Sequence, residues 1–333
     1  MGTGFLGQAG TVLSGDHAPT KEIDQDDDSA KNYPHLGFSM NSEKADAPRA
    51  VIVISSHVAR GSVGNRAAVF ALETLGFPVW AVPTVILPWH PGHGRATRIV
   101  PPLDQFKALM ADLERAPWLG EVGAVLSGYL GEAGQAEAVA SLVAAVKAKT
   151  PDAIYICDPV MGDSGGLYVP EPTAAAMRDR LMPIADIATP NRYELEWMAG
   201  APLPDLKSVI SAALHAGPST MLVTSAQSMM TGGTGNLLLD GTQALLAEHR
   251  LIDKPPNGLG DLTAAVYLAR ILSGQPPIKA LQSTTAAVYE ILARTAKRGG
   301  DELQLETDAQ SLSHPMAMVQ LRHLTHPGRD RRA

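Results

Sequence analysis

A glycine-lined acid stands near the C-terminal end of the chain, in Asn257-Gly258-Leu259-Gly260-Asp261. A strand-like stretch precedes this segment and an alanine-rich helical run follows it, so Asp261 should lie in the first turn of a helix. Glycines let consecutive backbone N–H groups converge on one point, and a helix N-terminus adds positive potential there. The segment can therefore hold phosphate beside a proton acceptor, which predicts phosphoryl transfer to an alcohol. The same potential should keep Asp261 ionised and make it a weak base.

Polar loops follow the other apolar runs of the chain. They are Ser55-Ser56-His57, Ser127-Gly128-Tyr129, residues 158–163, Thr189-Pro190-Asn191 and Thr224-Ser225. In an open parallel sheet, ligands bind beyond the carboxyl ends of the strands. We therefore expect these loops to converge on one edge of a sheet, where chemistry would take place.

The sheet is predicted from the alternation of short apolar runs with helical segments. Strands are expected at 51–54, 78–82, 124–126, 153–157, 184–188 and 221–223, and helices at 65–75, 103–115, 133–149, 173–181, 193–198, 206–215, 261–272 and 278–297. Strands 236–239 and 244–248 should form an antiparallel hairpin around Asp240-Gly241. Strand and helix in turn predict an α/β fold with a mostly parallel sheet.

The domain organisation follows from changes in composition along the chain. Residues 1–48 are rich in Gly, Asp, Ser, Pro and Lys without sustained periodicity, so we predict a mostly disordered extension. The run Val51-Ile52-Val53-Ile54 is typical of a strand buried on both faces and marks the start of the folded domain. We predict one domain over residues 49–310. Past Gly300 the chain should become irregular, and residues 311–333 should form a C-terminal tail.

Composition excludes several classes of function. The formal net charge of -7 and the lack of a basic stripe argue against nucleic-acid binding, because no row of cations could replace phosphate counterions. No run approaches the ~20 apolar residues that span a bilayer, and no secretion signal is evident. The single cysteine, Cys157, excludes an internal disulfide framework and a multi-cysteine zinc site. We therefore expect a cytoplasmic protein.

Several motifs, in the same order along the chain, resemble those of the pyridoxal kinases, the vitamin B6 kinases of the ribokinase-like superfamily. The matching segments are 56–68, 127–131, 157–163, Thr189-Pro190-Asn191 with Glu194, Val223-Thr224-Ser225 and 258–261. Motifs in the correct order are more specific than any one alone. The resemblance implies a three-layer ribokinase-like sandwich, with helices on both faces of the sheet, and a homodimer.

The resemblance also implies a role for each matching residue. Asp261 would be the base for the 5′-hydroxymethyl group of pyridoxal, pyridoxine or pyridoxamine, beside phosphoryl-binding N–H groups of Gly258, Leu259 and Gly260. The vitamin pocket would be lined by Ser56, Val63, His90, Pro91, Tyr129 and Asp261. ATP would be bound by Asp158, Asp163, Thr189, Asn191, Glu194, Thr224 and Ser225. Asp158 and Glu194 would hold Mg²⁺ directly or through water. A monovalent cation, K⁺ or Na⁺, is a further implied partner of the ATP-binding residues.

One segment departs from the family pattern. Pyridoxal kinases usually read Asn-Thr-Val-Gln-Phe-Ser-Asn-His-Thr-Gly-Tyr-Gly where this chain, at 83–94, reads Pro-Thr-Val-Ile-Leu-Pro-Trp-His-Pro-Gly-His-Gly. Pro91 replaces a threonine that donates to the substrate in the family, and proline has neither a hydroxyl nor an N–H. The departure, concentrated at 88–92, bears on which vitamer is bound. Trp89, His90 and His93 are interpreted as part of a substrate lid.

Other functions are compatible with parts of the sequence. Asp261 alone could simply cap a helix. A hydroxymethylpyrimidine or sugar kinase of the same superfamily would share the glycine-Asp end. Gly162-Asp163-Ser164-Gly165-Gly166 spells a serine-hydrolase motif, although Pro159 and Pro170 disfavour the strand-to-helix elbow that such an enzyme needs. A non-catalytic vitamin B6-binding module is a further alternative. No Gly-Lys dipeptide exists, which excludes a P-loop.

Overall fold

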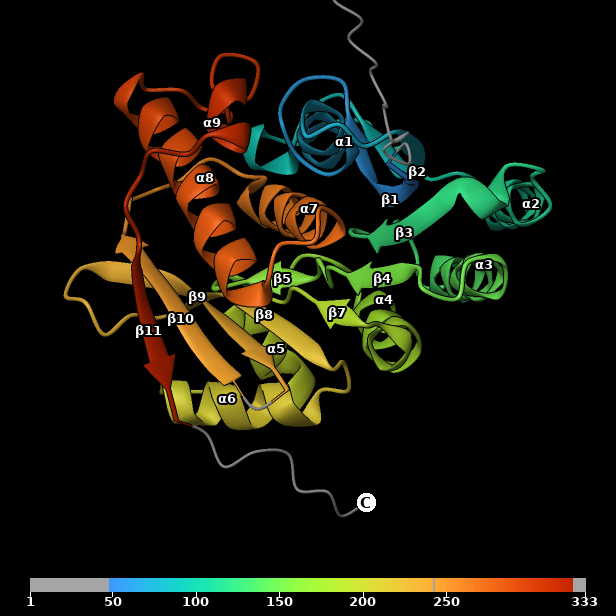
Figure 1. Cartoon of the computed structure of the whole chain (residues 1–333). Coiled ribbons are helices and arrows are strands. Elements are labelled where there is room, and N and C mark those ends of the chain that lie inside the picture. Colours follow the sequence, from blue (N-terminus) through green and yellow to red (C-terminus); the bar gives the residue numbers. More distant parts are fainter. Residues whose placement is uncertain (1–47, 242, 326–333) are drawn as a thin grey trace, which may run out of the picture. The chain divides into compact units, whose positions relative to one another are not determined.

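A nine-stranded sheet forms the middle layer of the structure, a computed structural model that describes residues 48–241 and 243–325 (Figure 1). Its order is β11-β10-β9-β8-β7-β4-β3-β1-β2. These strands are β1 (Ala50–Val58), β2 (Val79–Leu87), β3 (Val122–Ser127), β4 (Ile154–Cys157), β7 (Ile187–Ala188), β8 (Thr220–Gln227), β9 (Gly233–Asp240), β10 (Gln243–Arg250) and β11 (Gln320–Leu324). The disorder predicted for residues 1–48 falls, except at residue 48, outside the described residues.

Helices cover both faces of the sheet. One face carries α1 (Asn65–Thr74), α7 (Leu259–Leu272), α8 (Pro277–Lys297) and α9 (Ala309–Ser313), and the other α2 (Leu103–Glu114), α3 (Gln135–Lys149), α4 (Glu171–Ala176), α5 (Arg192–Ala199) and α6 (Leu206–His215). The α/β fold predicted from the sequence and the three-layer arrangement implied by the family resemblance are both confirmed. Of the helices described, none is long and apolar enough to cross a membrane.

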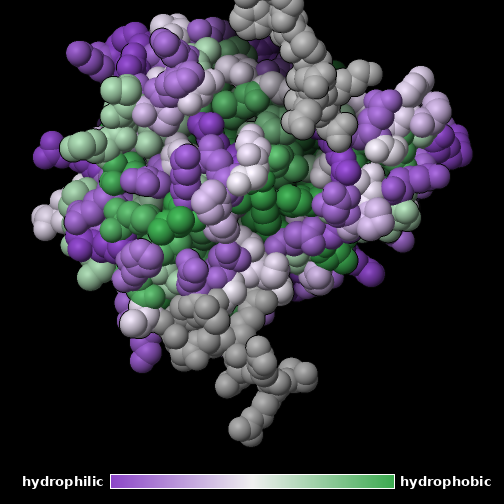
Figure 2. All heavy atoms as spheres, in the orientation of Figure 1, coloured by the Kyte–Doolittle hydropathy of each residue, from purple (hydrophilic) through white to green (hydrophobic). Residues whose placement is uncertain are grey.

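Each face of the sheet has its own hydrophobic core. Along β1, Ile52 and Ile54 pack into the core under α2 to α6, whereas Val51 and Val53 pack into the core under α1, α7 and α8. This division explains the continuous apolar run in the sequence, because a strand covered on both sides needs no polar face. In the space-filling view of Figure 2, green apolar side chains gather over the middle of one side of the molecule.

Strand direction creates a crevice at one edge of the sheet. Strands β2, β1, β3, β4, β7 and β8 are parallel, and β9, β10 and β11 continue the sheet with antiparallel pairing. From β1 the chain crosses over α1 to β2, and α2 then returns on the opposite face to β3, on the other side of β1. The carboxyl ends of β1 and β3 therefore flank a topological switch point, where ligands bind in such sheets.

The C-terminal segment differs from its prediction. The chain past Gly300 is not simply irregular, because it forms α9 and then β11, which pairs with β10 from Leu324 opposite Ala244 to Gln320 opposite Glu248. β11 has only five residues, three of them polar, so its periodicity is too short to identify it. The backbone groups at the free edge of β10 provide its stabilising partner.

Two smaller differences concern local structure. The helix expected at 173–181 ends as α4 at Ala176 and continues as a π-helical turn, Met177–Leu181, before a 3-10 turn that includes Pro183, whose missing N–H prevents a regular continuation. Strand β2 runs to Leu87, five residues beyond its predicted end, so the first part of segment 83–94 is strand rather than loop. Pairing with β1 through Leu87 stabilises this extension.

Candidate active site

A cavity of about 630 Å³ opens where the predicted loops meet. Its lining includes Ser56, Val63, His90, Pro91, Tyr129, Asp158, Asp163, Thr189, Asn191, Glu194, Thr224, Ser225, Gly258, Leu259, Gly260 and Asp261. These include every residue to which the family resemblance assigns a catalytic, vitamin-binding, ATP-binding or metal-binding role, so the structure brings that set together. Small-molecule sites typically have volumes of about 300–1,000 Å³.

The start of α7 forms one wall of the cavity. Gly258 caps this helix with a φ of 93°, and a Cβ there would lie 2.0 Å from the carbonyl oxygen of Ser62, so only glycine fits. The N–H of Leu262 donates to the oxygen of Gly258 at 3.0 Å. The N–H groups that precede it in the helix lie outside the intrahelical ladder, as expected for a first turn. This wall can therefore donate hydrogen bonds to an anion.

Asp261 lies at the switch point between β1 and β3. A Cβ added to Gly128, just after β3, would lie 2.5 Å from Ser55 Oγ and 3.8 Å from Asp261 Oδ1. Removal from water raises the pKa of Asp261 to about 6, although the N–H of Gly64 and its own N–H lower it. The expectation that the helix N-terminus makes Asp261 a weak base is wrong, because desolvation outweighs it. Asp261 stays ionised near neutral pH and is matched to proton transfer there.

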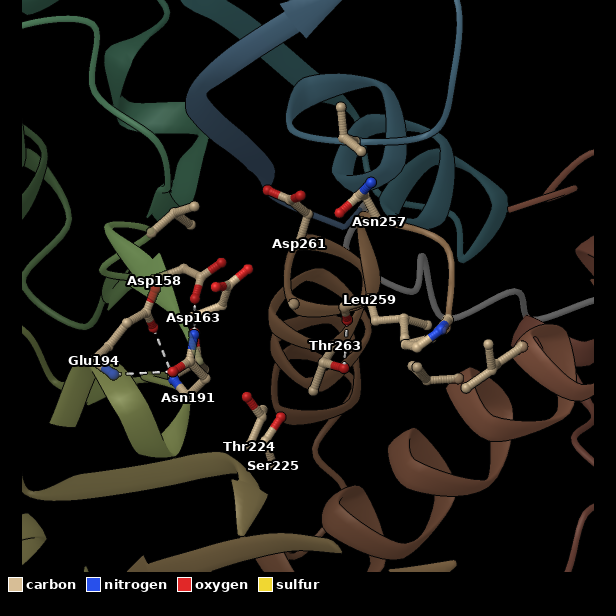
Figure 3. A pocket seen from close by; sticks show the side chains of 18 of the residues that line it. Asp158, Asp163, Asn191, Glu194, Thr224, Ser225, Asn257, Leu259, Asp261 and Thr263 are labelled. Carbon is tan, nitrogen blue, oxygen red and sulfur yellow. Dashed lines mark hydrogen bonds between the residues drawn. The ribbon is translucent and has the colours of Figure 1, made fainter. Parts of the chain in front are cut away.

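A pair of buried acids stands across the cavity from Asp261, as Figure 3 shows. Asp158 follows β4, is 4% exposed, and accepts a hydrogen bond from Thr189 Oγ1 at 2.8 Å through Oδ1. Burial and the charge of Asp261 raise the pKa of Asp158 to about 8, against the effect of Thr189. Burial and the charge of Asp158 likewise raise the pKa of Glu194 well above its usual range.

Glu194 is held by backbone donors. Its Oε1 accepts the N–H of Met161 at 2.9 Å, and its Oε2 accepts the N–H of Asn191 at 2.8 Å. Asn191 is the N-cap of α5, and its Nδ2 donates to the oxygen of Gly162 at 2.7 Å. Both ends of the Asn191 side chain are therefore engaged within the protein, which favours a positioning role for this residue.

These acids fit a cation bound together with phosphate. Asp158 raises the pKa of Glu194, and Asp261 in turn raises that of Asp158, so a positive charge beside these carboxylates would stabilise their ionised forms. The described hydrogen bond of Asp158 uses Oδ1, so Oδ2 can face a metal, whereas the bonded Glu194 suits a ligand role through water. Among residues 48–241 and 243–325 there is no cluster of three His, Cys, Asp or Glu for a metal. A magnesium ion here would complete its shell with phosphate and water oxygens, as it usually does.

The loops beside the acid pair are shaped by tight turns. Strands β5 (Gly162–Asp163) and β6 (Gly166–Leu167) form a short hairpin, and Asp163 Oδ1 accepts the N–H of Gly165 at 2.7 Å. Ser164 therefore lies in a hairpin turn and not between a strand and a helix. Opposite, Ser225 adopts a left-handed φ of 54° at a break in the register of β8. This strained conformation accompanies its place in the cavity wall beside Thr224.

The other end of the cavity is apolar. Val58, Val63, Val85 and Leu87 form a small hydrophobic cluster of their own, and Tyr129 packs against it. Tyr129 is held through its backbone, because its N–H donates to Ser55 Oγ at 3.1 Å and its carbonyl oxygen accepts from Thr84 Oγ1 at 2.7 Å. Ser56 adds a polar group to this wall. The pocket can hold a flat, partly apolar ring with a few polar substituents.

Residues 89–94, which we call the acceptor lid, border the apolar end. Pro91 begins a 3-10 turn, Pro91–His93, and His90 Nδ1 accepts the N–H of Gly92 at 3.1 Å. Trp89 Nε1 donates to the oxygen of Gly94 at 3.1 Å and so closes the loop on itself. His90 and Pro91 line the cavity. Proline suits the first position of such a turn because its N–H would have no partner there.

Part of the cavity was not predicted from the sequence. His249 of β10 stacks on Tyr289 of α8 with ring centroids 4.6 Å apart. Further unpredicted lining residues are Val58, Leu87, Arg98, Tyr168, Asn236, Leu251, Ile252, Thr285, Val288 and Leu292. Most of them come from antiparallel strands, loops and α8, where no motif marks them, whereas Val58 and Leu87 end the parallel strands β1 and β2 and carry no predicted role. The aromatic and aliphatic groups around His249 and Tyr289 suit a flat heterocycle.

Comparisons with known proteins agree with this geometry. A family model described as phosphomethylpyrimidine kinase matches residues 103–305. The chain is 38% identical to pyridoxal kinase PdxY of Rubrobacter xylanophilus, over 82% of this chain and 97% of the relative, and 37% identical to that of Leifsonia xyli, over 80% and 96%.

Solved structures of pyridoxal kinases are also similar to this chain. Pyridoxal kinase from Leishmania donovani, in complex with ADP and pyridoxamine, superposes with a TM-score of 0.78 at 29% identity, covering 83% of this chain and 99% of that one. A putative phosphomethylpyrimidine kinase from Bacteroides thetaiotaomicron has a TM-score of 0.76 at 20% identity, over 85% of this chain and all of that one, and supports the fold alone. With its ribokinase-like fold and these relatives over most of its length, the chain belongs to the pyridoxal kinase family.

Proposed function

We propose that this protein is an ATP-dependent kinase that phosphorylates the 5′-hydroxymethyl group of pyridoxal, pyridoxine or pyridoxamine. One observation carries the proposal: Asp261 lies between an apolar pocket and the acid pair, at the start of a helix whose first N–H groups can receive phosphate. An alcohol on a heterocycle and the end of a nucleoside triphosphate would meet at this acid. The relatives are named pyridoxal kinases, and the Leishmania donovani enzyme is described in complexes with ADP and either pyridoxamine or pyridoxine.

The proposed reaction is an in-line transfer. The 5′-hydroxyl oxygen attacks the γ-phosphorus of ATP while Asp261 accepts the hydroxyl proton, and the bond from the γ-phosphorus to the bridging oxygen breaks to release ADP. The N–H groups of Leu259 and Gly260, beside the Gly258 cap, stabilise the charge that gathers on the transferred phosphoryl oxygens. A carboxyl with a pKa of about 6 is ionised at neutral pH, so it can take the proton without prior activation.

The acid pair would hold Mg²⁺, Asp158 through Oδ2 and Glu194 through water. Bound there, the metal would neutralise charge on the ATP phosphates. Thr189 fixes Asp158 by its hydrogen bond, and the N–H donors of Met161 and Asn191 fix Glu194. We therefore assign these residues the role of keeping the carboxylates of Asp158 and Glu194 oriented toward the proposed metal site.

The nucleotide would extend from the acid pair to the aromatic end of the cavity. Its base would pack near the stacked His249 and Tyr289, and its phosphates would pass Asp163, Thr224 and Ser225. A monovalent cation near these last three residues stays a prediction from the family. The homodimer and the cytoplasmic location also remain predictions. Light scattering on the purified protein would test whether it is a homodimer.

The alternative functions differ in their support. A hydroxymethylpyrimidine kinase is favoured by the description of the matching family model, and its substrate also carries a hydroxymethyl group on a nitrogen heterocycle. A serine hydrolase is contradicted, because Ser164 lies in the hairpin between β5 and β6 and, in the described chain, no histidine hydrogen-bonds to it. A non-catalytic module is disfavoured, because both Asp261 and the donor-lined helix start are present.

The substrate assignment can be tested by direct assay. The purified protein would be supplied with Mg-ATP and, separately, pyridoxal, pyridoxine, pyridoxamine and hydroxymethylpyrimidine, while ADP release is followed by a coupled assay. We expect kcat/KM to be highest for a B6 vitamer. A clear preference for hydroxymethylpyrimidine would replace the proposed function with the alternative, and no turnover of any of the four above a no-enzyme control would reject both.

A further inference from the structure

A short segment after α8, residues 301–303, contacts two loops that border the apolar end of the cavity. Asp301 forms an ion pair with Arg60 at 2.8 Å, and the carbonyl oxygen of Leu303 accepts a hydrogen bond from Ser62 Oγ at 2.8 Å. Glu302, between them, reaches His93 of the acceptor lid. This segment is more than 200 residues away from both loops in sequence, so only the fold brings them together.

The contact between Glu302 and His93 has the properties of a specific pair. His93 Nε2 lies 2.8 Å from Glu302 Oε1, and the glutamate is 8% exposed. Arg60 Nη1 lies 3.7 Å from the same oxygen. A buried carboxylate is costly unless it is paired and hydrogen-bonded, so Glu302 depends on these partners. His93 can donate from Nε2 both as the neutral tautomer protonated there and as the cation.

Glu302 also contacts the loop that carries Ser62. Its Oε2 accepts the N–H of Ser62 at 3.4 Å, and the carbonyl oxygen of Ser62 faces Gly258, where a Cβ would lie only 2.0 Å away. Gly61 has a φ of 109°, and a Cβ on it would lie 2.6 Å from Glu302 Oε1. The chain at Gly61 therefore leaves room for this carboxylate. One side chain thus connects the acceptor lid with the loop packed on the start of α7.

We propose that Glu302 is a positioning residue that holds the acceptor lid closed over the alcohol substrate by binding His93. It is not among the residues that line the cavity, so it acts through the lid and through Ser62. His93 stands where the family pattern quoted above has a tyrosine. The inference rests on the proposed function, because the lid would close over a B6 vitamer. A closed lid should lower the KM for the vitamer and affect ATP little.

Steady-state kinetics of Glu302→Ala and His93→Ala test the pair. Each variant should raise the KM for the vitamer about 10-fold, the effect of losing one charged hydrogen bond, with the KM for ATP changed less than about 2-fold. The double variant should match Glu302→Ala, because both changes remove the same contact. Glu302→Gln, which keeps an acceptor for His93, should restore most of the affinity. Asp301→Asn is the matched control: it removes a neighbouring exposed ion pair and should stay within about 2-fold of the wild type.

Hydrogen exchange tests the lid without relying on activity. The amides of Gly92, His93 and Gly94 should exchange about 10-fold faster in Glu302→Ala and His93→Ala than in the wild type and in Asp301→Asn. Unchanged exchange in Glu302→Ala would contradict the proposed role of Glu302 in holding the acceptor lid closed. Single-variant effects on the vitamer KM that multiply in the double variant would contradict it as well. If the wild type were inactive but exchange in the acceptor lid changed in the variants as expected, the proposed function would be rejected. The contact between Glu302 and His93 would still be shown to hold the lid closed.

Discussion

Asn191 and Glu194 cap the same helix reciprocally. The N–H of Glu194 donates to Asn191 Oδ1 at 2.9 Å, and the N–H of Asn191 donates to Glu194 Oε2 at 2.8 Å. The second oxygen of Glu194 accepts the N–H of Met161, in the loop that carries Asp158. One acid therefore caps α5 and holds the loop at the phosphate end of the cavity, so stability and metal binding should change together when it is replaced.

Glu194→Gln tests this double role. The NH₂ group of the new glutamine would face one of the backbone N–H donors that now bind Glu194, and two donors cannot bond to each other. We therefore expect the free energy of unfolding to fall by about 1–2 kcal/mol. The concentration of Mg²⁺ needed for half-maximal activity should rise as well. Asp205→Ala removes the capping box of α6, outside the cavity, and should cost about 1 kcal/mol without changing the Mg²⁺ requirement. Thermal unfolding and Mg²⁺ titrations measure both. Equal Mg²⁺ requirements in the two variants would contradict a metal role for Glu194.

The pH dependence of activity should report Asp261. Its pKa is raised to about 6, and a base works only when deprotonated, so at saturating Mg-ATP the kcat/KM for the vitamer should fall about tenfold per pH unit as the pH drops below about 6. The free energy of unfolding should change with pH in the opposite direction. Because the folded pKa lies above the ordinary value of 3.8, ionisation of Asp261 opposes folding, and the loss grows from about pH 4 to pH 6 and then levels off.

Asp261→Asn should therefore unfold at a higher denaturant concentration than the wild type at pH 8, with a gain on the order of 1 kcal/mol after allowance for solvent in the cavity. At pH 4 the gain should vanish. Denaturant titrations at the two pH values measure it. An equal stability gain at both would show that the charge of Asp261 is not its cause.

Asp158 should make metal binding pH-dependent. Burial and the charge of Asp261 raise its pKa to about 8, and a metal ligand must be ionised, so the affinity for Mg-ATP should strengthen as the pH rises from 6 toward 8. In Asp158→Asn, Mg-ATP should stabilise the protein against heat no more than ATP with EDTA does. Glu171→Gln, an exposed acid at the start of α4, should behave like the wild type. If Mg-ATP stabilised Asp158→Asn against heat as much as it stabilises the wild type, Asp158 would be excluded as a metal ligand.

The aromatic end of the cavity should serve ATP alone. Tyr289→Ala removes the ring stacked on His249, and we expect the KM for ATP to rise about 10-fold, the scale of a lost aromatic contact with its buried area. The KM for the vitamer should change less than about 2-fold. Trp118→Ala, at a tryptophan 61% exposed beyond α2, provides a control with no expected effect. A larger effect on the vitamer than on ATP would reverse the proposed direction of the nucleotide.

The sequence predicts the phosphate-binding parts of the site well because they are local. Gly258 and Asp261 lie within four residues, and a left-handed glycine followed by a helix has a recognisable pattern. The alternation of strands and helices fixes where the loops converge, so Asp158 and Ser56 could also be placed. The strand predicted at 78–82 is shorter than β2, which continues through Pro83 to Leu87 because an edge strand tolerates proline.

Features that depend on distant segments could not be predicted in the same way. His249 and Tyr289 stack only because α8 packs beside β10, and neither residue belongs to a motif. The raised pKa of Asp261 reflects desolvation, which the helix start alone does not reveal. Glu302 reaches His93 across 209 residues of sequence, a contact that no local pattern indicates.

The most direct test of the account is single-turnover phosphoryl transfer by Asp261→Asn. With Mg-ATP and a B6 vitamer, the rate of transfer should fall by at least ~10²-fold relative to the wild type, because the alcohol proton has no acceptor. The affinity for ATP, measured by calorimetry, should change little, because asparagine keeps the size of the side chain. A transfer rate within about 2-fold of the wild type would contradict Asp261 as the base and, with it, the proposed chemistry of this site.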